Sequence, residues 1–149
     1  RMFENYYPGD DYADFVGVSS YNYGFCPSTV SVSAKWESYP EIFEPYISRM
    51  KVMAPNKPVI IAETATTSYY KYGVSDENVK NQWLVENYNY FVTNPSVAGV
   101  YYFNFTNFDA FSCDFEVIQK DRSSIGYKDA LMNPGYRYLS IRDLESLIP

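Results

Sequence analysis

The sequence contains no histidine and only two cysteines among its 149 residues. The lack of histidine excludes Ser-His-Asp and Cys-His catalysis within this chain, and it removes the commonest zinc ligand. Two cysteines alone do not make a metal site. We therefore expect no metal and no organic cofactor.

Positive charge is also scarce, because 12 Lys and Arg stand against 18 Asp and Glu, a net charge of −6. Nucleic-acid binding needs Lys and Arg clustered against phosphates, and the sequence has no basic cluster. It also has no hydrophobic run near the roughly 20 residues that span a bilayer. The composition thus excludes a nucleic-acid partner and predicts no membrane span.

Aromatic residues are abundant instead: 17 Tyr, 10 Phe and 2 Trp make up 19% of the chain. Rings with polar groups suit sugar binding, because sugar faces stack on them while hydroxyls bond to the phenol. A Tyr-rich core would give the same composition, so both interpretations stay open. The length and the 46% of hydrophobic residues predict one globular domain.

Strands are predicted to alternate with amphipathic helices along the chain, an order typical of βαβ units around a parallel sheet. Ser38 and Glu41 form a capping-box pattern at the first helix, and Ser75 or Asp76 can cap the second. A long aromatic loop is expected after the third strand. The predicted elements are strands 14–21, 59–63 and 97–105, helices 38–54 and 76–94, and a C-terminal helix marked by Tyr136, Leu139, Leu144 and Leu147.

Three stretches carry a family resemblance: residues 7–18 (Tyr-Pro-Gly-Asp, then Tyr-Ala-Asp-Phe-Val-Gly-Val), 57–64 (Lys-Pro-Val-Ile-Ile-Ala-Glu-Thr) and 97–104 (Val-Ala-Gly-Val-Tyr-Tyr-Phe-Asn). They resemble strands six, seven and eight of retaining barrel glycosidases, and most of all glycoside hydrolase family 26, whose members are mostly endo-β-mannanases. Tyr102 stands where that family usually has Trp.

The resemblance implies an α/β fold, a partial TIM barrel made of the last three βα units of a (β/α)8 barrel. Residues 1–149 would be the C-terminal portion of one glycosidase-like domain whose N-terminal units are missing. Such a barrel needs about 250 residues, and three units leave open sheet edges. We expect a processed or truncated product, completed by the missing N-terminal part or by another chain.

Glu63 ends the most strand-like run, at the position of the family's catalytic nucleophile. For an isolated Glu, the alternative is a carboxylate that caps a helix or pairs with Lys. A retaining glycosidase needs a second carboxyl group as acid/base, which this clan places after strand four, and no such strand is present. The chain is therefore expected to be inactive alone.

Other candidate site residues follow the predicted strands. The resemblance makes Tyr21 the residue that orients the nucleophile, although a rim or core Tyr is the alternative. Stacking or sugar-bonding roles are open to several residues, against the alternatives of rim packing for Trp36 and turn chemistry for Asn104, which also begins an Asn-Phe-Thr glycosylation sequon. Trp83 is expected in the core. The candidates for substrate binding are Trp36, Tyr23, Tyr69, Tyr102 and Asn104, with Tyr70, Asn107 and Phe108 nearby.

Cys26 and Cys113 follow the first and third predicted strands, so both lie on the same face of the expected barrel. In a secreted protein they could form a disulfide, and two free thiols are the alternative. Two functions remain. One is a fragment of a secreted retaining endo-β-1,4-glycanase, mannanase-like, that acts on a polysaccharide or oligosaccharide. The other is a non-catalytic descendant that binds carbohydrate or builds a larger assembly.

Overall fold

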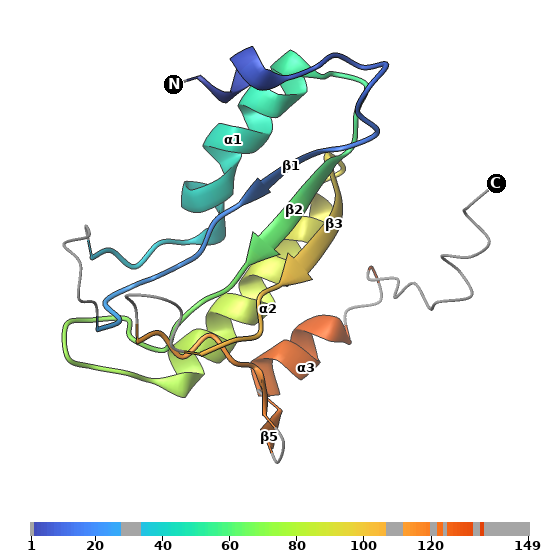
Figure 1. The fold of residues 1–149 in the computed structure, drawn as a ribbon. Coiled ribbons are helices and arrows are strands. Elements are labelled where there is room, and N and C mark those ends of the chain that lie inside the picture. The colour runs from blue at the N-terminus through green and yellow to red at the C-terminus, as the bar shows by residue number, and fades with distance from the viewer. Residues whose placement is uncertain are drawn as a thin grey trace.

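A computed structural model describes residues 2–27, 34–106, 112–119, 122–123, 125–132 and 135. Strands and helices alternate in the predicted order, and short elements follow the third strand (Figure 1). The elements are η1 (Phe3–Tyr6), β1 (Val16–Ser19), α1 (Tyr39–Met53), β2 (Val59–Thr64), α2 (Glu77–Thr93), β3 (Val97–Tyr102), β4 (Ile118–Gln119), β5 (Arg122–Ser123) and α3 (Ile125–Leu131).

The first three strands form a parallel sheet in the order β1-β2-β3. Their first residues are in register, because Val16 pairs with Val59 and Val59 pairs with Val97. Each crossover moves one place in the same direction, and right-handed crossovers then put both helices on one face of the sheet. Figure 1 shows α2 behind β2 and β3 and α1 beside β1. The α/β class and the parallel sheet are confirmed.

The main core lies between the sheet and these two helices. Val59 and Ile61 of β2, Phe43 of α1 and Leu84 of α2 are completely buried. Burying each of these side chains contributes roughly 1.5–3 kcal/mol. Trp83, predicted from the sequence to lie in the core, is 4% exposed and donates its indole N–H to the Glu37 carbonyl oxygen at 2.8 Å.

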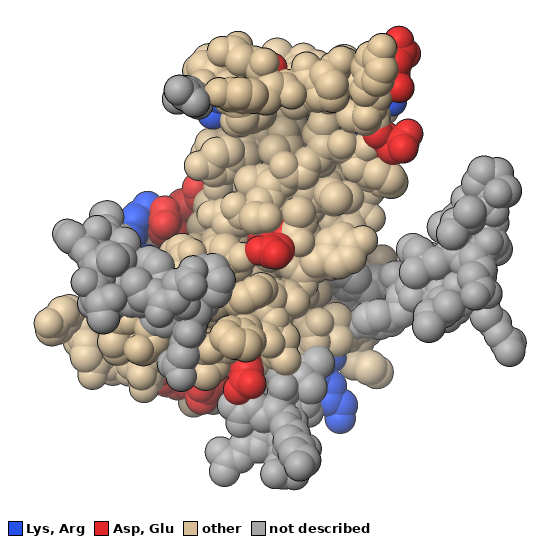
Figure 2. Space-filling model, viewed as in Figure 1, with Lys and Arg blue, Asp and Glu red and all other residues tan. Residues whose placement is uncertain are grey.

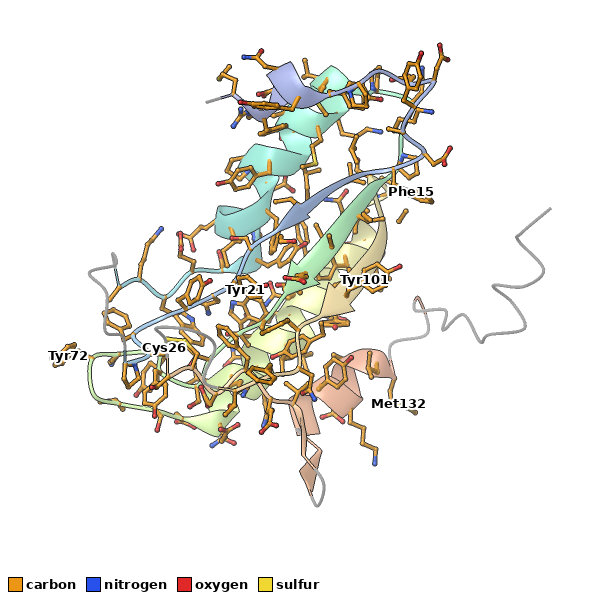
Figure 3. All side chains as sticks on the ribbon, viewed as in Figure 1. Phe15, Tyr21, Cys26, Tyr72, Tyr101 and Met132 are labelled. Atoms are coloured by element: carbon orange, nitrogen blue, oxygen red, sulfur yellow. A yellow bond between two sulfur atoms is a disulfide. The ribbon has the colours of Figure 1, made fainter. Side chains whose placement is uncertain are left out.

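The opposite face of the sheet has no helix over it in the described part of the chain. Its middle residue is Ile60, between two glycines of the flanking strands. A Cβ on Gly17 would lie only 2.9 Å from Ile60 Cγ1, and one on Gly99 would lie 3.8 Å from Ile60 Cγ2. Phe15 and Tyr101 remain more than half exposed near this face, which therefore offers apolar surface (Figure 3).

Both helix starts follow the capping chemistry read from the sequence. Glu41 accepts hydrogen bonds from the Ser38 main-chain N–H at 2.8 Å and from the Ser38 hydroxyl at 2.7 Å. Of the two candidates at the second helix, Asp76 is the N-cap, and its carboxylate accepts from the Asn78 N–H at 2.8 Å. These caps fix where the chain turns away from the end of β1 and β2.

The third strand ends at Tyr102, three residues earlier than predicted, because the following residues bind a later segment instead. Asn104 Oδ1 accepts from the Val117 N–H at 2.7 Å, and Thr106 pairs antiparallel with Asp114. The expected loop after this strand also contains β4, β5 and α3, which are too short to show a periodicity. The predicted C-terminal helix at 136–147 lies outside the described residues.

The close packing of α3 on α2 has a local cause in Gly126. A Cβ there would lie 2.4 Å from the Asn81 Cα, so only glycine lets the two helices approach this closely. Among the described helices, none is long and apolar enough to cross a membrane.

Candidate active site

The candidate site is built at the C-terminal end of β2, where the strand alternation breaks. Val59 and Ile61 point into the core, and strict alternation would send residue 63 the same way. The register instead shifts between Val18 and Ser19, and Ser19 pairs with Glu63. The carboxylate is thereby exposed while Thr64 is buried. Such an irregularity re-aims a side chain at a strand end.

Tyr21 lies beside this carboxylate, although 42 residues separate the two in sequence. Its hydroxyl donates a hydrogen bond to Glu63 Oε2. The main chain holds the pair in place, since the Ser20 N–H donates to the Glu63 carbonyl oxygen at 3.1 Å. Burial, and then the hydrogen bond to Glu63, raise the pKa of the Tyr21 phenol. Tyr21 therefore stays protonated, as a donor, over the ordinary pH range.

An aromatic cluster supports Tyr21 from behind. The Phe115 ring stacks on the Tyr21 ring, with centroids 5.6 Å apart and planes 10° apart. Tyr23 and Phe103 contact the Tyr21 ring at centroid distances of 5.5 and 5.7 Å. Tyr23 was predicted from the sequence as a site residue, whereas Phe103 and Phe115 were not. Their only signal was the aromatic content of the region after β3.

The segment that carries Phe115 is fastened to the loop after β1. Cys26 and Cys113 form a disulfide with Cα atoms 5.2 Å apart, and the Ser112 N–H donates to the Pro27 carbonyl oxygen at 2.8 Å. The bridge closes a sequence separation of 87 residues. It therefore holds the two sides of the aromatic cluster together (Figure 3 labels Cys26 and Tyr21).

A buried lysine of α2 also anchors the segment that carries Phe115. Lys80 is 1% exposed, and its ammonium donates to the carbonyl oxygens of Asp114 and, at 2.9 Å, of Glu116. Its nitrogen also lies 3.7 Å from Asp114 Oδ2. Phe115 lies between these two anchored carbonyls, so the position of its ring depends on Lys80. Burial lowers the pKa of the Lys80 ammonium.

Asp114 completes this buried network. Its Oδ1 accepts hydrogen bonds from the Thr67 hydroxyl and, at 2.9 Å, from the Ser68 N–H. Burial alone would raise the pKa of Asp114, but the Lys80 charge and the hydrogen bonds from Ser68 and Thr67 outweigh it, so the pKa lies below its usual 3.8. The ionised carboxylate thus ties the loop after β2 to the segment after β3.

A second, uncharged tie joins the loops after β1 and β2. Asn22 is completely buried, donates from Nδ2 to Thr66 Oγ1 at 3.0 Å, and accepts at Oδ1 from the Glu37 N–H at 3.2 Å. Asn22 and Thr66 also pair as a parallel bridge. The sheet thus continues past the strand ends beyond Tyr21 and Glu63, and this fixes the spacing of the two loops.

The remaining predicted residues have structural contacts. The Tyr102 hydroxyl donates to the Phe115 carbonyl oxygen at 2.8 Å, and burial raises the pKa of this phenol. The Asn104 amide oxygen accepts a hydrogen bond from the Val117 N–H. This is turn chemistry, the alternative to a role in sugar binding. The Tyr69 ring packs against the disulfide cluster, and the half-buried Trp36 ring packs against the main core. Asn107 and Phe108 lie outside the described residues.

The face that carries the candidate site is mostly uncharged. Figure 2 shows one acidic group in its middle, over the end of β2, within a broad uncharged surface. Among the described residues, no group of three or more Cys, Asp or Glu side chains could hold a metal ion. The arrangement offers an exposed carboxylate, a fixed phenol donor and an aromatic cluster. This combination suits attack by the carboxylate on an uncharged substrate.

Comparisons with known proteins relate the chain to glycoside hydrolases. Over 99 residues it is 31% identical to Endoglucanase H of Acetivibrio thermocellus, a match that covers 65% of this chain and 10% of that protein. Its fold is similar to that of an endo-β-1,3-glucanase of glycoside hydrolase family 128 from Sorangium cellulosum. That structural match has a TM-score of 0.53 and 15% identity, and it covers 83% of this chain and 43% of the other. No family model matches.

The chain therefore spans about a tenth of the length of the curated relative and less than half of the structural neighbour. The sequence likeness supports a relationship to glycoside hydrolases in general and does not single out family 26. The structural likeness, at this identity, shows the fold alone.

Proposed function

We propose that this chain is the C-terminal part of a (β/α)8 barrel of a secreted retaining β-glycanase, similar to family 26, in which Glu63 is the nucleophile. The observation that carries the proposal is the exposed Glu63 carboxylate at the end of a parallel strand, held by the Tyr21 hydroxyl. Barrel enzymes place catalysis at this end of their strands.

In this proposal Glu63 attacks the anomeric carbon of a β-linked sugar and forms a glycosyl–enzyme ester as the aglycone leaves. A second carboxyl group, contributed by a strand that precedes this chain, protonates the leaving oxygen and then activates water. Tyr21 holds one carboxylate oxygen by its hydrogen bond, which leaves the other oxygen aimed at the sugar. The adjacent rings form an aromatic wall beside the carboxylate.

The substrate class follows from the relatives and the surface together. The curated relative is named an endoglucanase, and the structural neighbour an endo-β-1,3-glucanase. The uncharged, aromatic surroundings of Glu63 suit a neutral polysaccharide better than an acidic one. The substrate is therefore a neutral β-linked glycan, with β-glucan and β-1,4-mannan the first two polymers to test.

The direct test replaces Glu63 in the full-length protein. Glu63→Gln keeps the shape and removes the nucleophilic oxygen, so hydrolysis of glucan or mannan should fall by at least about 10³-fold while the melting temperature stays unchanged. Glu44→Gln, the same exchange on α1, is the matched control and should keep full activity. Retention of activity in Glu63→Gln would reject the assignment.

Azide separates a nucleophile from an acid/base. In Glu63→Ala, azide can occupy the space of the lost carboxylate and attack an aryl β-glycoside that carries a good leaving group. The C–N bond forms as the C–O bond to the aryl oxide breaks, so the product of the nucleophile variant is the α-glycosyl azide. A β-glycosyl azide would instead assign Glu63 to the acid/base role. If the wild-type protein hydrolyses neither polymer, the non-catalytic alternative is favoured.

A further inference from the structure

A groove of about 550 Å³ lies on the helical side of the molecule, between the first turns of α1 and the middle of α2. Its floor is formed by the buried rings of Tyr39 and Trp83, and its walls include the half-buried rings of Trp36 and Tyr90. The volume is in the range of sites for small ligands, ~300–1,000 Å³. Both tryptophans of the 149-residue sequence line this one groove.

The groove does not belong to the candidate active site. It lies between two helices that cover the helical face of the sheet, whereas Glu63 and its aromatic cluster lie at the strand ends. Because β1, β2 and β3 are neighbours in the sheet, α1 and α2 are neighbours as well. Further barrel strands would add at the outer edges of β1 and β3, so completion of a barrel would leave this groove open.

The rings that line the groove are held rigidly. The Trp83 indole N–H is fixed by the Glu37 carbonyl oxygen, and the Tyr39 ring packs at 4.3 Å from Phe43 and at 5.1 Å from Tyr90, centroid to centroid. The Tyr90 hydroxyl accepts from the Asn94 amide at 2.9 Å. A rigid aromatic surface loses little conformational entropy when a flat apolar ligand stacks on it.

The charged groups of the groove, among its described residues, are carboxylates. Glu41, Glu86 and Gln82 line it, and Gln82 donates to Glu86 Oε1 at 2.7 Å, which orients that carboxylate. No Lys or Arg is among the described residues that line it. The Lys35 ammonium, outside this lining, pairs with Glu37 at 3.1 Å and with Glu41 at 3.8 Å. This chemistry disfavours anions and suits a neutral ligand that donates hydroxyl hydrogen bonds.

We propose that this groove is a second glycan-binding site, which holds about two or three sugar units of a neutral β-linked polysaccharide outside the active site. Sugar faces stack on Trp36 and Tyr90, and hydroxyls donate to the carboxylates of Glu41 and Glu86. The choice of a glycan as the ligand rests on the proposed function, whereas the groove is present whatever that function is. The site keeps a polymer on the protein between cleavage events.

Binding is measured on the full-length protein that carries Glu63→Gln, so that the polymer is not cut. Soluble mixed-linkage β-glucan and β-mannan are cast in native gels, and cellohexaose and mannohexaose are titrated while tryptophan emission is recorded. Tyr90→Ala and Glu86→Ala should each weaken polymer retardation by at least about tenfold. The emission change should shrink in Trp36→Phe, which leaves Trp83 as the remaining tryptophan of the groove.

The matched control is Tyr72→Ala. Tyr72 is 90% exposed at a loop tip far from the groove, and Figure 3 shows it pointing away from the molecule. This variant should bind the polymer like the parent. With Glu63 restored, Glu86→Ala should hydrolyse a short aryl glycoside at the wild-type rate but the polymer more slowly.

Undiminished retardation in both Tyr90→Ala and Glu86→Ala would overturn the proposal. Retardation that disappears in 0.5 M salt, where the Debye length is about 4 Å, would also overturn it, because binding by stacking and hydroxyl hydrogen bonds to a neutral polymer does not depend on ionic strength. Loss of both polymer binding and aryl-glycoside hydrolysis in Glu86→Ala would also overturn it. A protein that binds through the groove but hydrolyses nothing would reject the proposed function and keep this site.

Discussion

The hydrogen bond between Tyr21 and Glu63 fixes the orientation of the Glu63 carboxylate in the candidate site. A carboxylate at an exposed strand end is free to rotate, and rotation spreads its two oxygens over many positions. Tyr21 is itself fixed by rings on two sides, with Phe115 stacked and Phe103 edge-on. Phe115 therefore positions Tyr21, and Tyr21 positions Glu63.

Tyr21→Phe tests this positioning role. The substitution keeps the ring and its stacking on Phe115, so the melting temperature should change by no more than about 2 °C. It removes the hydrogen bond to Glu63, so kcat of the full-length enzyme should fall about 10–100-fold with little change in KM. Tyr23→Phe, in the same cluster, is the control and should retain activity. Equal losses in both variants would indicate general damage to the cluster.

The sequence could point to Glu63 and Tyr21 because their places depend on local pattern: an apolar run that ends in Glu, and a Tyr shortly after another strand. The role of Phe115 could not be predicted from the sequence, for a physical reason. It meets Tyr21 only because the disulfide and Lys80 fold the segment after β3 back onto the site. Substrate-binding roles were predicted for Tyr102 and Asn104, but both side chains form hydrogen bonds with main-chain groups of the segment after β3.

Helix α2 does more than cover the sheet, because it delivers a buried ammonium to the segment around Asp114. Lys80 satisfies two carbonyl oxygens and one carboxylate, while Asp114 also receives bonds from Thr67 and Ser68. A buried lysine without its partner is costly, since an uncompensated charge remains. The loop after β2 and the segment after β3 therefore meet at the Asp114 carboxylate, which hydrogen bonds from Thr67 and Ser68 and the Lys80 charge hold in place.

The pH dependence of the unfolding free energy in Asp114→Asn tests this coupling. Because the pKa of Asp114 is lowered in the folded protein, its stabilisation is present above the unfolded pKa, about 3.8, and is lost as pH falls through the folded value. At pH 7 the variant should lose about 2–4 kcal/mol of unfolding free energy. The difference from wild type should shrink below pH 4, as urea denaturation monitored by circular dichroism can measure.

The comparison with wild type matters because Glu77 titrates in the opposite sense. Burial raises the pKa of Glu77, so its contribution to stability falls as pH rises through the unfolded value. Because Asp114 itself contributes to that rise, both proteins are compared in a Glu77→Gln background, which removes this term. A difference that stays constant from pH 7 to pH 3 would show that the Asp114 charge does not hold the loop.

The elements predicted best from sequence are those with strong local signals. The capping box at Ser38 and the apolar run of β2 fixed their elements to within a residue or two, because their backbone preferences need no distant partner. The hairpin β4–β5 and helix α3 were missed because they are short and depend on tertiary contacts, such as the approach of Gly126 to Asn81.

As a whole molecule, the chain presents a sheet with two unpaired edges and an uncovered apolar face in its described part. Ile60 lies between two glycines on that face, and its side chain covers Gly17. The glycines add no side chains beside Ile60, so large side chains from other strands can pack over it, as in the layered interior of a barrel. Phe15 and Tyr101 are 55% and 63% exposed. Open strand edges beside apolar surface favour association.

Residues 1–149 produced alone should therefore bind the dye ANS strongly and elute above the mass of a monomer in size-exclusion chromatography. A longer polypeptide, extended at the N-terminus by the preceding part of its natural protein, should elute as a monomer and lose most of the ANS signal, because the added strands pair with the edges and fill the face. Introducing a charge at the middle of the face, as in Ile60→Lys, should solubilise the short chain but destabilise the longer one by several kcal/mol. A short chain that is monomeric, binds no dye and tolerates Ile60→Lys as well as the longer one does would show that its sheet needs no further strands, and the barrel assignment would then fall.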